Sequence, residues 1–225
     1  MRNIVVGDIH GCDALLNKLL FDIIQVQPTD KIITLGDYID RGPNSYGVVQ
    51  TLIDLKEYCD LTCLKGNHED LLLKSNDIAY QLIWLRNGAV KTIDSYVRSQ
   101  GLPLGSFSDL DIHSIFQLLP ESHLKFFNSC KLYHEDENNI YVHANYNPKL
   151  LMQSQTEEDM IWKHVKNDNM PAQHISGKKV WLGHTPQKSH TITDLGHVAL
   201  IDVGSAKSGY IAAVDTLSGH VWYAS

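Results

Sequence analysis

The segment Gly7-Asp8-Ile9-His10-Gly11 follows the apolar run Ile4-Val5-Val6 and decides the fold. A short apolar run bounded by a turn is typical of a buried strand, and the two glycines favour a tight turn after it. In α/β sheets, residues just beyond the carboxyl ends of parallel strands face the ligand-binding crevice. We therefore expect Asp8 and His10 to lie at that edge of a parallel sheet.

Three further segments are built in the same way. Gly36-Asp37-Tyr38-Ile39-Asp40-Arg41-Gly42 follows Ile32-Ile33-Thr34-Leu35, and Gly66-Asn67-His68-Glu69 follows Leu61-Thr62-Cys63-Leu64. Gly183-His184-Thr185 lies late in the chain. Each segment places Asp, Asn or His in a glycine-flanked turn after an apolar run, so we expect the site along one sheet edge.

The residue types in these turns indicate a site for two divalent metal ions. Carboxylate, imidazole and amide oxygen suit Mn, Fe, Zn or Mg, whereas structural zinc and iron–sulfur sites are rich in thiolates. Asp8 and His10 are separated by one residue, so both can reach the first ion from an extended turn. Asp37 has two carboxylate oxygens and is suited to bridge the two ions.

The second ion needs ligands from later in the chain. Asn67 and His184 are expected to hold it together with one more histidine. His143 is the best candidate, because it follows the β-branched and aromatic run Ile140-Tyr141-Val142. The predicted cofactor is a pair of divalent ions, with Mn preferred and Fe, Zn or Mg as alternatives.

Six ordered segments together resemble a known family. They are GDIHG, GDYIDRG, GNHE, HANY, GHTP and Ile201-Asp202-Val203-Gly204, and they span residues 7–204. Their order and spacing are similar to those of the metal-dependent phosphoprotein phosphatases, in particular the bacterial and bacteriophage serine/threonine branch of the calcineurin-like metallophosphoesterases. The resemblance implies an α/β (α+β) fold, with a central mixed β-sandwich flanked by helices.

Phosphoester hydrolysis at such a site needs no nucleophilic side chain, because a hydroxide bridging two metals can attack phosphorus in line. A leaving alkoxide needs a proton, which His68 can donate while Asp40 holds it as a cation. The guanidinium of Arg41 can grip two phosphoryl oxygens, beside Asn67. The resemblance implies the same catalytic roles for His68, Asp40 and Arg41. It also implies that the metal ligands are Asp8, His10, Asp37, Asn67, His143 and His184.

One segment departs from the family pattern. In the bacterial branch, a second phosphate-binding arginine usually lies two residues after the tryptophan of a Leu/Ile-Trp-x-Arg segment, whereas Ile161-Trp162-Lys163-His164 has histidine there. His164 is therefore a candidate phosphate-binding residue, with Lys163 and Lys166 as alternative cations. None of the three is a fork-shaped bidentate donor, so the departure bears on substrate affinity more than on the type of reaction.

The first third of the chain alternates strand and helix. A helix is expected over about residues 13–26, where Asp13 can cap it, and its leucines and isoleucines recur at helical spacing. A second helix is expected to start at Asn44 or Ser45. This part should form a parallel βαβαβ unit.

The remaining two thirds of the chain change character. Residues 69–130 carry helical patterns and are expected to form a mainly helical insertion over one rim of the site. The second half shows short strands with hairpin signals at 137–139, 194–196 and 217–219, which predicts a mainly antiparallel arrangement. Because no linker rich in Pro, Gly or Ser divides the chain, residues 1–225 are expected to form a single metallophosphatase domain.

Composition excludes several classes of protein. A net charge of −7 argues against nucleic acid as a partner, because counterion-release binding needs a basic face. The sequence contains no apolar run of about 18 residues, the length that a membrane-spanning helix needs, so no membrane partner is expected. Met1 leads directly into the first apolar run, so we expect a cytoplasmic protein, and its four cysteines have the spacing of reduced thiols rather than of a metal site.

Two residues in the last part of the chain have ordinary interpretations. Asp202 is expected to form a turn or to support His184, rather than to ligate a metal directly. Lys207 lies in a glycine-flanked turn and could touch the substrate, although a solvated loop lysine is favoured.

The favoured function is hydrolysis of phosphoserine and phosphothreonine, with a phosphorylated protein or a small phosphoester as the substrate. The nearest alternative is a symmetrical bis(5'-nucleosyl)-tetraphosphatase, whose family lacks the spelling Asp40-Arg41-Gly42 in the second segment. A broad-specificity metallophosphoesterase usually ends in Gly-His-x-His, whereas Pro186 occupies the last position here. A non-catalytic binding module would have lost ligands, and all of the expected ones are present.

Overall fold

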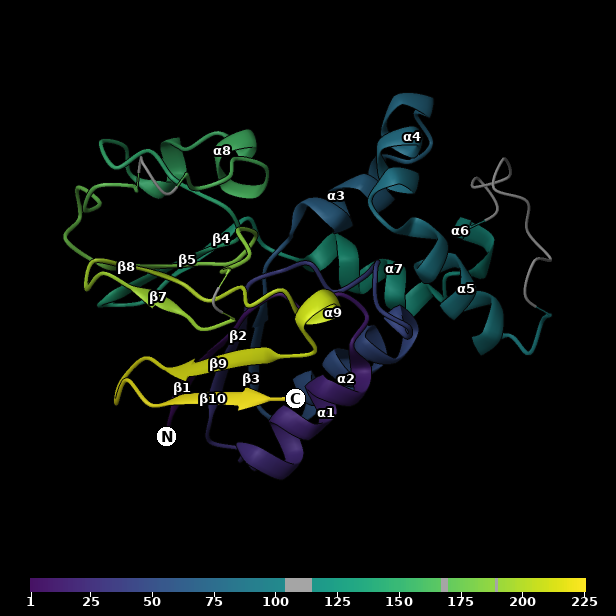
Figure 1. Ribbon diagram of the computed structural model, residues 1–225, viewed down its shortest axis with the longest axis horizontal. Helices are drawn as coiled ribbons and strands as arrows, with labels where there is room; N and C mark the ends of the chain where they lie inside the picture. Colours follow the sequence, from purple (N-terminus) through teal and green to yellow (C-terminus); the bar gives the residue numbers. More distant parts are fainter. Residues whose placement is uncertain (104–114, 167–169, 189) are drawn as a thin grey trace.

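The structure is a computed structural model that describes residues 1–103, 115–166, 170–188 and 190–225. Two mixed β-sheets pack face to face, and helices cover their outer sides (Figure 1). The layer between the sheets contains side chains from both, including Val5, Ile33, Tyr141 and Trp181. The predicted fold class, a mixed β-sandwich flanked by helices, is confirmed.

The first sheet has the strand order β10-β9-β1-β2-β3. Strands β1, β2 and β3 pair in parallel, as the βαβαβ prediction requires, and β9 and β10 extend the β1 edge in antiparallel pairs. The strands are β1 (Asn3–Val6), β2 (Lys31–Thr34), β3 (Asp60–Cys63), β9 (Ile211–Asp215) and β10 (Val221–Ala224).

The two helices of this unit pack their apolar sides against the first sheet. Helix α2 (Ser45–Tyr58) begins as predicted, because the side chain of Asn44 accepts a hydrogen bond from the backbone N–H of Gly47 at 3.1 Å. The predicted first helix is α-helical only over α1 (Asp13–Asn17) and continues as a π-helix, η1 (Lys18–Ile23). Asp13 does not cap it; instead, its carboxylate accepts hydrogen bonds from the side-chain amides of Asn17 and Asn44.

The second sheet has the order β4-β5-β6-β8-β7. Its three central strands, β5, β6 and β8, pair in parallel, which the sequence did not predict. The pairs formed by β4, β7, β9 and β10 are antiparallel, so the second half of the chain is mainly antiparallel, as predicted, around this parallel centre. The predicted hairpins are present, but only at the edges, between β4 and β5 and between β7 and β8, and in the first sheet between β9 and β10. The strands are β4 (Tyr133–Glu135), β5 (Asn139–Val142), β6 (Lys179–Leu182), β7 (Thr193–Asp194) and β8 (Val198–Leu200).

A long crossover explains the parallel centre of this sheet. Parallel neighbours require a connection of a dozen or more residues, and residues 143–178 separate β5 from β6. This connection holds η3 (Met152–Ser154) and α8 (Glu157–Ile161), and Figure 1 shows α8 above the second sheet.

The predicted insertion is helical in the parts that the structure describes. Its helices form a lobe beside the two sheets (Figure 1), and residues 104–114 lie outside the described ranges. None of the described helices is long and apolar enough to cross a membrane. The helices are α3 (Asn67–Lys74), α4 (Ile78–Arg86), α5 (Ala89–Ser99), α6 (Ile115–Leu118) and α7 (Glu121–Ser129), and the short α9 (Ser205–Ser208) follows β8.

Candidate metal centre

The polar turns of both sheets meet at the carboxyl ends of their parallel strands. The loops after β1, β2 and β3 supply one side of the centre, and the loops after β5 and β6 supply the other. The structure thus brings together side chains that are up to 176 residues apart, such as Asp8 and His184.

Five residues of these loops have left-handed backbone conformations that side chains rarely adopt. The φ angles are 48° for His10, 53° for Asp37, 72° for Asp40, 65° for Arg41 and 60° for His184. Such conformations cost about 1–3 kcal/mol each and persist only where the surroundings fix them. Among the described residues other than glycine, only Gln25 and His190 share this feature, so strain is concentrated at the centre.

Glu69 fixes the most strained loop. Its buried carboxylate accepts hydrogen bonds from the backbone N–H groups of Asp37 at 2.9 Å, Tyr38 at 2.8 Å and Gly66 at 2.9 Å. Burial raises the pKa of this carboxyl group to about 7. No role was predicted for Glu69, although its position three residues after Gly66, at the start of a helix, is the signal of a capping box.

Two glycines allow the backbone to approach the central carboxylates. A Cβ atom on Gly66 would lie 2.1 Å from Oδ1 of Asp37, and one on Gly183 would lie 2.2 Å from Oδ1 of Asp8. Both distances are well inside van der Waals contact. Any side chain at either position would displace a carboxylate of the centre.

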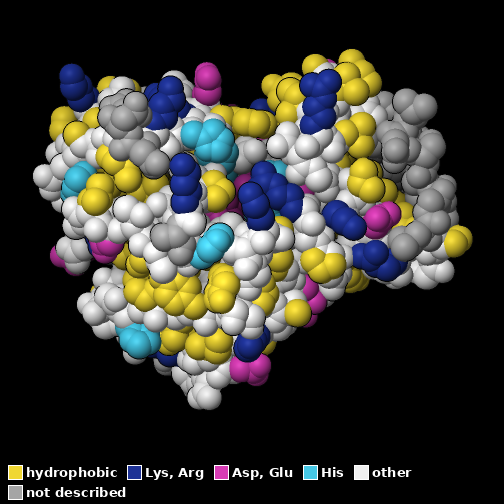
Figure 2. All heavy atoms as spheres, in the orientation of Figure 1, with side chains coloured by type: hydrophobic (Ala, Val, Ile, Leu, Met, Phe, Trp, Pro, Cys, Tyr) yellow, Lys and Arg dark blue, Asp and Glu magenta, His cyan; other side chains and the backbone are white. Residues whose placement is uncertain are grey.

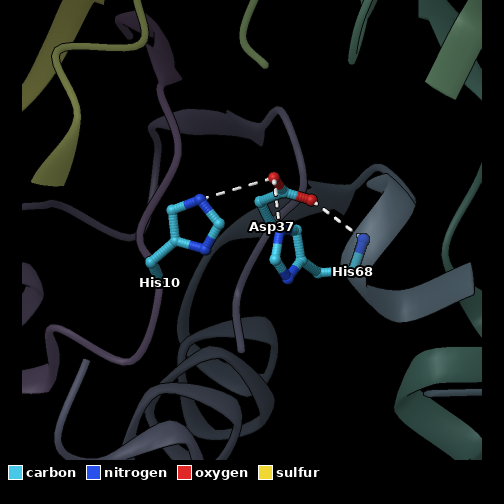
Figure 3. A group of neighbouring side chains, drawn as sticks. All are labelled: His10, Asp37 and His68. Atoms are coloured by element: carbon cyan, nitrogen blue, oxygen red, sulfur yellow. Dashed lines mark hydrogen bonds and ion pairs between the residues drawn. The ribbon is translucent and has the colours of Figure 1, made fainter. Parts of the chain in front are cut away.

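The first group of possible ligands is His10, Asp37 and His68, whose ligand atoms lie within 4.8 Å of one another (Figure 3). Nε2 of His10 is 3.4 Å from Oδ2 of Asp37. Nδ1 of His10 donates to the carbonyl oxygen of Ile39 at 3.0 Å, which makes Nε2 the acceptor and the possible ligand atom. Burial lowers the pKa of His10 to about 3, so its imidazole is neutral, the form that binds metals.

The second group is Asp37, His143 and His184, so Asp37 belongs to both groups. Nδ1 of His143 donates to the carbonyl oxygen of Leu35 at 2.8 Å, and its Nε2 lies 3.4 Å from Oδ1 of Asp37. The amide oxygen of Asn67 is 3.2 Å from the same Nε2. The residues that were predicted to hold the second ion therefore lie close together.

His184 is held in the opposite tautomer. Its Nε2 donates to the carbonyl oxygen of Trp162 at 3.0 Å, which leaves Nδ1 available as the ligand atom. Burial lowers the pKa of His184 to about 3, so this ring is also neutral.

Asp8 lies beside these groups rather than within them. Both of its carboxylate oxygens accept the backbone N–H of His184, at 3.1 and 3.0 Å, and its carboxyl group also bonds to that of Asp202. Burial raises the pKa of Asp8 well above its usual value and that of Asp202 to about 6. Asp202 forms the predicted turn by accepting the N–H of Gly204 at 2.7 Å, and it reaches His184 through Asp8.

The donor set fits a pair of divalent ions. The carboxylates of Asp8, Asp37 and Asp202 are at most 2% exposed, and buried carboxylates need positive charge nearby. The neighbouring neutral imidazoles and the Asn67 amide oxygen add the nitrogen and oxygen donors that Mn, Fe, Zn and Mg accept. The two buried His/Asp groups are thus consistent with a dinuclear metal site.

His68 differs from the other histidines of the centre in the direction of its pKa shift. Its Nδ1 lies 2.5 Å from Oδ2 of Asp40, a carboxylate that also accepts bonds from Trp84 Nε1 at 2.8 Å and Thr92 Oγ1 at 2.6 Å. Burial alone lowers the pKa of His68, but the charge of Asp37 and the bond to Asp40 outweigh it, so the pKa is raised. A histidine that favours its cation suits proton donation better than metal ligation.

Arg41 extends over the opening of the first group. Its side chain is exposed, with Nη1 2.7 Å from Nε2 of His10 and Nη2 2.9 Å from Nε2 of His68. The guanidinium plane therefore lies where a phosphoryl group above both rings could be gripped by two N–H groups. The structure therefore brings Arg41 to the first group of possible ligands.

His164 lies at the second group. Its exposed ring stacks on His184, with ring centroids 4.1 Å apart and an angle of 23° between the planes. Lys163 is turned away and pairs with Asp159 at 2.7 Å. Of the three candidates from this segment, His164 is the one whose ring contacts a possible ligand of the centre.

Two layered mixed sheets with buried His and Asp side chains at their shared edge form the metallophosphoesterase fold. The chain belongs to the calcineurin-like phosphoesterase family, whose model matches residues 1–205. It is 29% identical to serine/threonine-protein phosphatase 1 of Salmonella typhimurium over 210 residues, which are 92% of this chain and 88% of that protein.

Other similar proteins are named for a different activity. A symmetrical bis(5'-nucleosyl)-tetraphosphatase of Wigglesworthia glossinidia brevipalpis is 27% identical over 169 residues, 63% of this chain and 61% of that protein. A solved structure of a proposed diadenosine tetraphosphatase has a TM-score of 0.71 at 22% identity, covering 99% of this chain and 92% of that one. The chain is therefore a phosphoesterase with relatives of more than one specificity.

Proposed function

We propose that this phosphoesterase is a serine/threonine protein phosphatase that hydrolyses phosphomonoesters. The main support for this proposal is the pair formed by Asp40 and His68. The buried carboxylate of Asp40 lies 2.5 Å from Nδ1 of His68 and raises the pKa of its imidazole. An alkoxide is a strongly basic leaving group and needs a proton as its bond to phosphorus breaks. A dinucleoside tetraphosphate instead releases a nucleotide, whose phosphate leaves without one.

In this proposal, the metal ligands are divided between the two ions as predicted from the sequence. Asp8, His10 and Asp37 hold one ion, and Asp37 shares the second with the later ligands. When bound, the ions lower the pKa of water and neutralise phosphoryl charge. We infer Mn as the preferred ion, with Fe, Zn or Mg as alternatives, because the donors are oxygen and imidazole nitrogen and include no thiolate. The ligands of the second ion are Asp37, Asn67, His143 and His184.

The remaining side chains act on the substrate. Arg41 turns its two N–H groups from the imidazoles to the phosphoryl oxygens and orients the ester, with Asn67 beside it. Nε2 of His68 then delivers its proton to the ester oxygen, while Asp40 keeps the ring in position through Nδ1. His164 supplies a further contact to the phosphate from the second group.

A direct competition between substrates tests the proposal. We expect the enzyme to lose hydrolysis on chelation, to regain it with added Mn, and to turn over a phosphothreonine peptide faster than diadenosine tetraphosphate. Substantial activity after complete demetallation would contradict the metal-dependent mechanism. Preference for the tetraphosphate would instead favour a nucleotide hydrolase, the activity for which one of the similar proteins is named.

A further inference from the structure

The surface beside Arg41 contains a pocket that the proposed catalytic roles leave unassigned. Its volume is about 270 Å³, and it lies next to the first group of possible ligands. In the described part of the chain its lining contains two cations and no carboxylate. The lining residues are His10, Arg41, Pro186, Gly204, Ala206 and Lys207.

Lys207 is available for a ligand. Its side chain is exposed on α9, and no carboxylate of the described residues pairs with it. Other lysines near acidic side chains are paired, as Lys163 is with Asp159 and Lys179 with Asp194. Figure 2 shows Lys and Arg side chains gathered near the middle of the displayed face, where the surface is hollowed.

The fold holds the backbone of Lys207 next to the metal centre. The hydroxyl of Ser205, two residues earlier, donates to the carbonyl oxygen of Ile9 at 2.9 Å. The N–H of Gly204 bonds to Asp202, whose carboxyl group contacts Asp8. Helix α9 is therefore tied at its start to the loop that carries His10, and its lysine stays at the rim of the same pocket.

From this geometry we propose that Lys207 forms an anion subsite for a second negative group of the substrate, next to the scissile phosphate. The inference rests on the proposed function, because it assumes that the scissile phosphate lies under Arg41. The second anion is an acidic side chain of a phosphopeptide or a further phosphate of a small ester. Both have the charge that Lys207 recognises, whereas a neutral neighbour gains nothing from it.

The experiment compares kcat/KM among matched substrates. The set is a phosphothreonine peptide flanked by glutamine, the same peptide with glutamate on either side, and diadenosine tetraphosphate. At low salt we expect a glutamate peptide to exceed the glutamine peptide by about fivefold, the upper range for an exposed ion pair. Lys207→Ala should remove this ratio, Lys207→Arg should keep it, and 0.5 M salt should reduce it. Lys149→Ala, at another exposed lysine, is the control and should keep it.

The outcomes separate the subsite from the reaction itself. A ratio lost for the glutamate peptides assigns the subsite to peptide carboxylates, and a loss confined to the tetraphosphate assigns it to a second phosphate. An equal loss on every substrate, or a Lys207→Ala enzyme that loses neither the glutamate preference nor selectively its turnover of the tetraphosphate, would overturn the subsite. p-Nitrophenyl phosphate carries no second anion, so failure of the native enzyme to hydrolyse it would instead count against the proposed function.

Discussion

The two sides of the metal centre are held with very different strength. On the first-sheet side, Glu69 bonds to three backbone N–H groups, and Asp40 accepts bonds from Trp84, Thr92 and His68. On the second-sheet side, the ring of His184 has one carbonyl partner and is covered by an exposed histidine. The difference indicates that positioning is strictest where the shared carboxylate and the proton donor lie, and looser where the second ion is completed.

Asp37 belongs to both groups of possible metal ligands, so its substitution should affect both sides of the centre. We expect Asp37→Asn to release metal from both groups and to slow hydrolysis by about 10⁴-fold or more, because bound ions supply several kcal/mol and about 1.36 kcal/mol is tenfold. Metal content and p-nitrophenyl phosphate turnover measure the effect. Asp30→Asn removes a buried carboxylate that pairs with Arg2 and should keep the metals. An Asp37→Asn protein with two ions and near-native turnover would contradict the shared-ligand assignment.

Substitution of His68 tests whether the general acid lies on the first-sheet side of the centre. We expect His68→Asn to keep both metals and to slow hydrolysis of alkyl phosphates by about 10²–10⁴-fold, the usual share of a general acid. Aryl phosphates should lose less, because their leaving group needs little protonation. His123→Asn changes a buried histidine of the helical lobe and should leave the ratio unchanged. Loss of metal on His68→Asn would make His68 a ligand instead.

The pH dependence of an Asp40 variant tests the same assignment of the general acid. Its charge and hydrogen bond raise the pKa of His68, so Asp40→Asn lowers that pKa and the acid loses its proton at lower pH. We expect the alkaline limb of kcat/KM for an alkyl phosphate to move to lower pH, with a loss of about 10–100-fold at the optimum. Thr92→Val removes one hydrogen bond to Asp40 without changing its charge and should move the limb less. An unmoved limb would separate Asp40 from the proton donor.

The smallest effect is expected on the loosely held side. His164→Arg keeps a planar group over His184 and adds a bidentate donor, so KM for phosphate monoesters should fall by about two- to fivefold at constant metal content. Lys163→Arg, whose side chain points to Asp159, is the matched control and should change nothing. A higher KM in the His164→Arg enzyme would mean that phosphate is held without this position.

Local patterns predicted the turns of the site because each is encoded next to its own strand. The apolar run and the flanking glycines are enough to place Asp8, Asp37 and Asn67 at strand ends, and the ordered segments linked them to His143 and His184. The support of these turns could not be predicted in the same way. Trp84 and Thr92 reach Asp40 from helices 44 and 52 residues away, and only tertiary packing brings them there.

The features of the fold that the sequence did not predict have a similar origin. Hairpin signals act between neighbouring strands, so they identified the edges of the second sheet but not its parallel centre, which depends on the crossover after β5. A helix starting at Asp13 was predicted and is present, but its last turns are π-helical. The N–H of Ile24 bonds to the carbonyl oxygen of Leu19, five residues earlier. Apolar spacing does not separate these two helix types.

The left-handed residues of the site set a limit on how heat-resistant this enzyme can become. At about 1–3 kcal/mol each, five such residues cost about 5–15 kcal/mol, which rivals the whole stability of an ordinary domain. Glycine at Arg41, whose side chain is exposed, would relieve part of that strain and raise the melting temperature, while removing a side chain that acts on the substrate. Selection for thermostability alone would therefore erode these positions first, and a screen that scores activity together with stability is needed to retain them.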